Sequence, residues 1–142
     1  MNKTRTAVLT AEFDAPPEAV WDVMTDNRDY AWRSDLQRIE ILCEDKVFCE
    51  YTKGGQKTEF FITEKKRCER YAFHMENKMF KGEWKGEFSP RGKGCKVVLT
   101  ETIHIKNPAI YLLSFLMMNL KKVQKTYVSD LKKKLAEDKA GR

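Results

Sequence analysis

Residues 80–88, Phe-Lys-Gly-Glu-Trp-Lys-Gly-Glu-Phe, set the fold class of this 142-residue chain. Aromatic residues and glycines alternate strictly with charged residues along the segment, which is the period of two that a β-strand shows. One face of the predicted strand is therefore aromatic, and the other is a solvated row of charges. A turn at Gly92-Lys93-Gly94 and a second alternating segment, residues 95–105, follow it directly.

The same period extends over the central half of the chain and over residues 5–14. Val47, Cys49 and Tyr51 form the predicted apolar face of one of these strands. The pair Gly54–Gly55 predicts a hairpin turn after that strand, because both positions tolerate positive φ. We expect seven strands, one at the start of the chain and six in its centre.

Helical patterns lie after the first predicted strand and after the last. Pro16-Pro17-Glu18 predicts a helix start, because proline fits the first turn and an acidic residue there complements the helix dipole. Residues 25–33 predict a second short helix, with a loop as the alternative. Residues 108–137 predict one long helix with apolar residues at three- and four-residue steps. Only this helix is large enough to cover a mostly antiparallel sheet, so the predicted class is α+β.

Composition and charge narrow the classes of function. Apolar residues make up 42% and charged residues 34%, which excludes a disordered tail or a fibre. The formal charge is +6, but both signs are interleaved, so we expect no nucleic-acid partner. The longest uncharged stretch, residues 107–120, is shorter than the roughly twenty residues of a bilayer span. We expect one cytoplasmic domain over residues 1–142, without an export signal.

Metal and cofactor sites have little support in the sequence. The four cysteines form no C-x-x-C pair, and neither histidine lies near one at ligand spacing. We expect reduced thiols, no metal and no cofactor. By alternation, His74 and His104 fall on the polar faces of their strands, so both are expected to face solvent.

Residues 13–26, Phe-Asp-Ala-Pro-Pro-Glu-Ala-Val-Trp-Asp-Val-Met-Thr-Asp, followed by Tyr30 and Trp32, resemble the opening of the START-like domains of the SRPBCC superfamily. These include polyketide cyclase/dehydrase-like proteins and pollen-allergen-like ligand binders, and the order of predicted elements is similar over about residues 5–137. The resemblance implies a helix-grip fold, a curved seven-stranded antiparallel sheet around a long C-terminal helix with an apolar cavity between them. It also implies binding of lipids, sterols, hormones or polyketides, with cyclisation or dehydration in some members.

Glu101 is the most informative polar residue of the sequence. It falls on a strand face that is otherwise apolar, with Leu99 and Ile103 as its neighbours, so alternation points its carboxyl toward the long helix. A desolvated carboxyl has a raised pKa and could anchor a ligand hydroxyl or act as a general acid or base. The alternatives are a bulge that turns Glu101 outward, or pairing with a basic residue.

The residues after the first predicted helix are candidates for the mouth of the implied cavity. Trp32 could wall the entrance, and Tyr30 or Arg33 could bond a ligand head group. The alternative is ordinary packing of this segment on the edge of the sheet.

The other candidates lie on the predicted inner faces of the strands and of the long helix. Trp84 stands between Gly82 and Gly86, which either leave room for a ligand or let the strand bend. The complete candidate set for ligand binding is Tyr30, Trp32, Phe60, Tyr71, Phe73, Met75, Trp84, Phe88, Leu99, Glu101, Leu113, Met117 and Leu120.

Three functions remain open on the sequence. The first is binding or transport of a small hydrophobic ligand, lipid or polyketide-like, between sheet and helix. The second is a cyclase- or dehydratase-like enzyme with Glu101 and a tyrosine as acid and base. The third is a peripheral membrane or regulatory partner that uses the apolar first half of the long helix, whose lysines otherwise form a wet helix face. The oligomeric state stays open.

Overall fold

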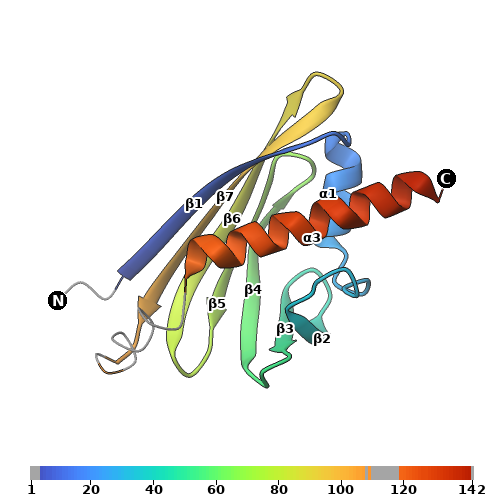
Figure 1. Cartoon of the computed structure of the whole chain (residues 1–142). Coiled ribbons are helices and arrows are strands. Elements are labelled where there is room, and N and C mark those ends of the chain that lie inside the picture. Colours follow the sequence, from blue (N-terminus) through green and yellow to red (C-terminus); the bar gives the residue numbers. More distant parts are fainter. Residues whose placement is uncertain (1–3, 108, 110–118, 142) are drawn as a thin grey trace.

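In the computed structural model of the chain, one curved sheet carries on its concave side the two helices that the described residues define (Figure 1). The structure describes residues 4–107, 109 and 119–141. The sheet has seven strands in the order β1-β7-β6-β5-β4-β3-β2. The strands are β1 (Thr4–Phe13), β2 (Leu36–Cys43), β3 (Val47–Thr52), β4 (Lys57–Lys66), β5 (Arg70–Glu76), β6 (Phe80–Arg91) and β7 (Gly94–Ile105).

All neighbouring strands are antiparallel. Strands β2 to β7 form a meander, and the last strand, β7, also pairs with the first, β1. The hairpin between β6 and β7 closes at Gly92–Lys93, where Gly92 has a φ of 57°. The predicted turn at Gly54–Gly55 also forms, with Gly55 at a φ of 86°. The predicted seven strands, their antiparallel pairing and the α+β class are confirmed.

One short helix, α1 (Pro17–Thr25), lies between β1 and β2. It begins at the predicted position, with proline at its start and Glu18 in its first turn. Of the two alternatives for the next segment, the second short helix is wrong and the loop is confirmed, because residues 26–35 form turns and irregular chain. Asp26 Oδ1 accepts a hydrogen bond from the backbone N–H of Arg28 at 3.0 Å, a local bond that competes with helix formation.

The C-terminal helix α3 (Leu120–Ala140) is shorter than the predicted one. Asn119 is extended (φ −114°, ψ 101°), and its Oδ1 accepts a hydrogen bond from Lys122 N at 3.1 Å. It is therefore an N-cap, and the predicted uninterrupted helix over 108–137 is wrong at this residue. The candidate site residues Leu113 and Met117 lie outside the described residues.

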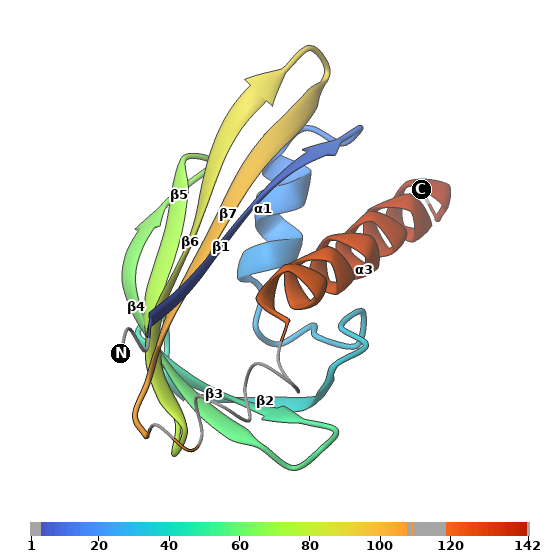
Figure 2. The ribbon, with the colours of Figure 1, turned by 60° about the vertical axis from the view of Figure 1, so that its left-hand side comes forward.

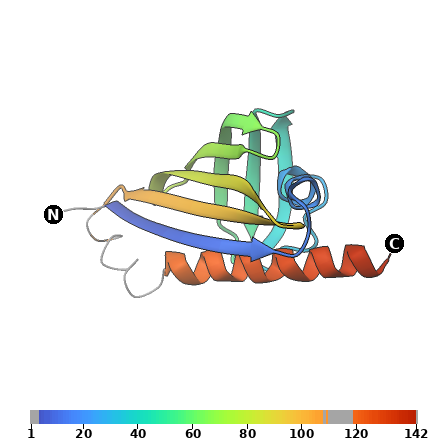
Figure 3. The same cartoon turned by 90° about the horizontal axis from the view of Figure 1, so that it is seen from above.

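The helix α3 crosses the concave face and lies along the edge strand β1 (Figures 2 and 3). Gln124 Nε2 donates to the carbonyl oxygen of Ala7 at 3.0 Å, and Lys121 Nζ donates to that of Val8. These contacts anchor the helix to the strand that ends the sheet.

Near α1 the concave face is packed solid, and we call this region the closed end. Trp21 of α1 lies edge-on to Phe88 of β6, with ring centroids 5.3 Å apart. Val20 is fully buried, and Leu131 of α3 is 1% exposed. These side chains form core between the sheet and both helices, and Cys95 of β7 is buried with them.

Candidate functional site

The other half of the concave face encloses a cavity of about 520 Å³ between α3 and strands β3 to β7. Small-molecule sites typically measure about 300–1,000 Å³. Most of the wall is apolar. The buried apolar residues in it are Met24, Phe48, Phe60, Tyr71, Phe73, Met75, Phe80, Leu99, Ile103 and Leu120.

The mouth of the cavity lies between three segments: the residues before β2, the β3–β4 turn and the first turns of α3. We define it by the wall residues that are also exposed, which are Ser34, Asp35, Lys53, Gly54, Lys122, Val123 and Thr126. Val123 is 47% exposed, a large apolar side chain in an otherwise polar rim. A ligand entering here would pass from polar groups to aromatic ones.

Aromatic rings form a continuous wall inside the cavity. Trp84 of β6 stacks on Phe73 of β5 with ring centroids 4.8 Å apart and an interplanar angle of 1°. Tyr127 of α3 meets Trp84 edge-on at 6.2 Å. Trp84 and Tyr127 are only partly buried although both lie between sheet and helix. Both residues also line the cavity.

Glu101 lies on the concave face of β7, opposite Trp84 of β6 and Ala7 of β1, and it lines the cavity. Among the described residues it has no hydrogen-bond or ion-pair partner. Burial raises the pKa of Glu101 to about 7; the nearby charge of Glu50 adds to the rise, and that of Arg33 opposes it. A carboxyl with this pKa can give or take a proton near neutral pH.

Arg33 supplies the positive charge inside the cavity. Its Nη1 bonds Glu50 Oε2 at 3.2 Å, and its Nε and Nη2 bond the carboxylate of Asp35 at 3.1 and 3.0 Å. The guanidinium carbon also lies 5.0 Å from the ring centroid of Tyr127. Because two carboxylates already bind this guanidinium, its charge is largely neutralised before any ligand arrives.

Two wall residues hold polar atoms that are buried and have no partner among the described residues, Tyr71 Oη and Gln124 Oε1. Burial raises the pKa of Tyr71 to about 12, although the neighbouring Asn27 side chain opposes the rise. The Gln124 amide is fixed because its Nε2 donates to the carbonyl oxygens of Ala7 and Leu99. These atoms add polarity to a wall that is mainly apolar.

The sequence-predicted site residues separate into groups in the structure. The wall of the cavity includes Phe60, Tyr71, Phe73, Met75, Trp84, Leu99, Glu101 and Leu120. Phe88 lies at the closed end against Trp21. Trp32 packs edge-on against Tyr127 at 5.4 Å, outside the wall, and its Nε1 donates to the carbonyl oxygen of Asp29. Tyr30 lies in the same turn segment and does not line the cavity.

The glycines beside Trp84 leave no free room for a ligand. A Cβ at Gly82 would lie 2.6 Å from the carbonyl oxygen of Thr102 and 2.9 Å from Met75 Cε. A Cβ at Gly86 would lie 3.2 Å from the Trp84 ring. A side chain at Gly82 would clash with the backbone and one at Gly86 would crowd the Trp84 ring, so close packing explains these glycines.

The sequence analysis did not identify Glu50 as a residue of the cavity wall. Val47, Cys49 and Tyr51 had formed the predicted apolar face of β3, yet Phe48 and Glu50 line the cavity. Phe48 and Cys49 are both buried, so this strand has apolar residues on both faces. Phe48 and Glu50 are two residues apart and therefore share a strand face, and this spacing was the available signal.

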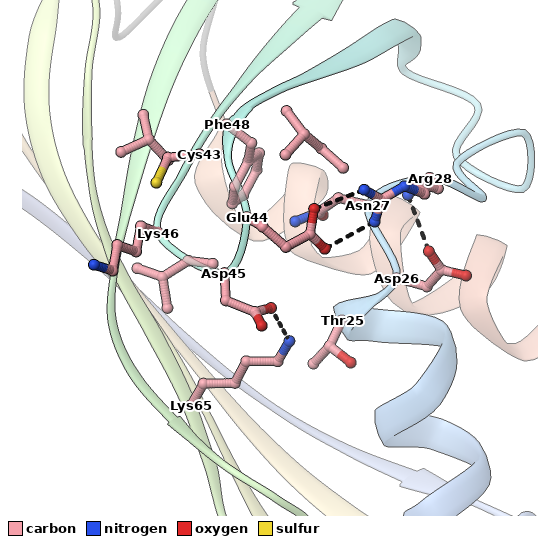
Figure 4. A pocket seen from close by; sticks show the side chains of 13 residues that line it. Thr25, Asp26, Asn27, Arg28, Cys43, Glu44, Asp45, Lys46, Phe48 and Lys65 are labelled. Atoms are coloured by element: carbon pink, nitrogen blue, oxygen red, sulfur yellow. Dashed lines mark hydrogen bonds and ion pairs between the residues drawn. The ribbon is translucent and has the colours of Figure 1, made fainter.

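A second hollow of about 90 Å³ lies between the end of α1 and the β2–β3 turn (Figure 4). Two ion pairs lie within the hollow. Arg28 binds both carboxylate oxygens of Glu44, at 2.8 and 2.6 Å, and Lys65 Nζ lies 2.6 Å from Asp45 Oδ1. Its small volume and paired charges leave the larger cavity as the candidate site.

The described part of the chain holds no group of three or more His, Cys, Asp or Glu side chains that could bind a metal ion. His74 and His104 are exposed, as predicted, and the four cysteines are free thiols. No helix within the described ranges is long and apolar enough to cross a bilayer.

A sequence model of one protein family, polyketide cyclase / dehydrase and lipid transport, matches residues 4–136. The chain belongs to this family. No curated protein matches it significantly. The family places the chain among proteins that act on or carry polyketides and lipids, and leaves its own ligand open.

Solved structures share the helix-grip fold of this polyketide cyclase / dehydrase and lipid transport family member. The Zhui aromatase/cyclase from a Streptomyces species superimposes with a TM-score of 0.79 at 13% identity, over 94% of each chain. A START superfamily protein from Mycobacterium smegmatis gives 0.72 at 16% identity, over 93% of this chain and 97% of that one. Norcoclaurine synthase from Thalictrum flavum, in complex with dopamine and hydroxybenzaldehyde, gives 0.72 at 12% identity, over 94% and 87%. At these identities the likeness establishes the fold alone.

Proposed function

We propose that this protein binds or transports a small hydrophobic ligand, lipid or polyketide-like, in the cavity between α3 and the sheet. The observation that carries the proposal is the cavity of about 520 Å³ with its wall of Phe73, Trp84 and Tyr127. Glu101 is the polar anchor in this proposal, since a carboxyl without a protein partner can hydrogen bond a ligand hydroxyl or carbonyl. Free thiols are in keeping with a reducing location such as the cytoplasm.

The apolar wall alone supports useful affinity. Burying roughly ten ligand methylenes contributes on the order of 8 kcal/mol before other costs. Association and ordering then cost several kcal/mol, and the polar contacts of Glu101 return part of it. The gross figure corresponds to a Kd of about 1 μM, so after these costs the net Kd lies between about 1 μM and 1 mM, which suits a carrier that must also release its ligand.

A neutral apolar dye, N-phenyl-1-naphthylamine, tests the proposal directly. We expect the dye to bind with increased fluorescence, and Trp84→Ala to weaken it about tenfold because the main aromatic face of the wall is lost. Phe61→Ala is the control, because Phe61 is 39% exposed and does not line the cavity. The proposal fails if both tests are negative: the dye does not bind, and native mass spectrometry of the purified protein finds no small molecule.

The state of Glu101 also favours a second candidate, a cyclase- or dehydratase-like enzyme. In a dehydration, the carboxylate takes a proton from carbon, and the resulting acid donates a proton to the hydroxyl that leaves as water. A pKa of about 7 lets one carboxyl do both, and Tyr71 and Tyr127 lie on the same wall. Glu101→Gln separates the candidates: an enzyme loses turnover of a polyketone while still binding it, whereas a carrier changes only modestly in affinity.

A further inference from the structure

Inside the cavity, carboxylates outnumber cations. Arg33 is the one cation of the described wall inside the mouth, and Glu50 and Asp35 already bind it. Glu101 is left without a cation. An anionic group of a ligand would meet like charge and lose its hydration in this interior, so it is disfavoured there.

The mouth has the opposite character. Lys53 in the β3–β4 turn and Lys122 in the first turn of α3 both line the cavity and are exposed. Neither has an ion-pair partner among the described residues. Asp35, the acidic residue of the defined mouth, is bound by Arg33 at 3.0 Å. Lys53 and Lys122 therefore border the opening, and neither has a carboxylate partner among the described residues.

The position of Lys122 is costly for the helix itself. The N-terminal end of a helix carries positive partial charge and favours acidic residues, but the first turn of α3 has none and contains two lysines. Lys121 has a structural contact, since its Nζ donates to the carbonyl oxygen of Val8. Lys122 has no side-chain contact of this kind in the described structure. A lysine that opposes the helix dipole and has no compensating contact is typical of a functional position.

We propose that the ligand is an amphiphile with an anionic head group, a carboxylate or a phosphate, which Lys53 and Lys122 hold at the mouth. The apolar part then fills the cavity beside Trp84. This inference rests on the proposed function and adds the chemistry and the orientation of the ligand. The reverse orientation is disfavoured because it places the anion beside Glu50 and Glu101.

Three compounds of ten carbons test the head group: decanoic acid, decyl phosphate and decanol, each displacing N-phenyl-1-naphthylamine near neutral pH. We expect the two anions to bind about tenfold more tightly than decanol in low salt, because two partly exposed ion pairs form. High salt should remove most of this advantage. The comparison of carboxylate with phosphate then shows which head group the mouth prefers.

Single variants locate the effect. Lys53→Gln and Lys122→Gln should each reduce the advantage of decanoic acid about threefold, and the double variant should abolish it, with decanol binding unchanged. Lys125→Gln is the matched control: the same charge change on the same helix, at an exposed lysine that does not line the cavity.

Two results overturn the inference while the proposed function stands: equal affinity for decanoic acid and decanol, or an equal loss in Lys125→Gln and Lys122→Gln. If neither the dye nor any of the three compounds binds, the proposed function fails and this inference fails with it.

Discussion

The closed end and the cavity are two halves of the same concave face, built from the same alternating strands. At the closed end, Trp21 and Leu131 from the two helices reach the sheet and fill the space. Over the cavity, side chains of α3 and Met24 at the end of α1 face strands β3 to β7 without filling the space, and Trp84 keeps part of its surface accessible. The comparison teaches that the reach of the helix side chains, rather than the pattern of the strands, decides whether an apolar face becomes core or cavity.

The two halves also differ in the polar groups they accept. The core at the closed end is apolar apart from the Cys95 thiol, which burial keeps protonated by raising its pKa to about 11. The cavity wall holds Arg33, Glu50 and Glu101. Arg33 and Glu50 pair with each other at 3.2 Å, which lowers the cost of burying both charges, whereas the raised pKa of Glu101 reflects the cost of burying it without such a partner.

The largest expected difference between the two halves is the loss of a tryptophan from each. Trp21→Ala should lower the free energy of unfolding by about 3–5 kcal/mol, because it leaves a void in solid core. Trp84→Ala should cost about 1–2 kcal/mol, since part of its ring already faces the cavity. Urea unfolding of both variants measures the difference. Equal losses would mean that the cavity is packed as tightly as the closed end.

The second prediction concerns the charge in the cavity. The pKa of Glu101 is raised from 4.5 to about 7, so its contribution to stability is complete below about pH 4.5 and is lost as the pH rises through 7. Glu101→Gln should therefore stabilise the protein at pH 8 by about 2–3 kcal/mol and change little at pH 4. Urea unfolding of both proteins across this pH range checks it. A constant difference between the two proteins would contradict the burial of this carboxyl.

The smallest expected effect concerns the hydroxyl of Tyr71, a wall residue whose ring lies edge-on to that of Trp21. Its Oη is buried without a partner, so Tyr71→Phe should raise the free energy of unfolding by up to about 1 kcal/mol. Thermal unfolding without ligand measures it. A clear loss of stability would show instead that the hydroxyl makes a hydrogen bond, for example to water in the cavity.

Much of the fold could be predicted because β-alternation is a local property. The orientation of Glu101 was predicted correctly because β7 pairs with both neighbours without a shift in register, so strict alternation holds along it. Glu50 was missed because β3 buries Phe48 on one face and Cys49 on the other, so the pattern of apolar residues does not indicate which face of the strand is the inner one. The break before α3 was missed because apolar periodicity continues through Asn119.

The mouth of the cavity could not be predicted from the sequence. Lys53 and Lys122 lie far apart in the chain, and each by itself is indistinguishable from any other solvated lysine. They border one opening only because α3 starts at Leu120 and the meander places the β3–β4 turn at the same opening. Such a site depends on tertiary arrangement, which a local pattern does not encode.

The attachment of α3 to β1 has a consequence for how a ligand could be exchanged. An edge strand with free backbone groups is a template for pairing between molecules, and here side chains of α3 occupy carbonyl groups of Ala7 and Val8. Swinging the whole helix away would bare that strand and invite self-association. Local opening near Lys122 would keep the edge strand covered, so the same helix both closes the cavity and shields the edge of the sheet.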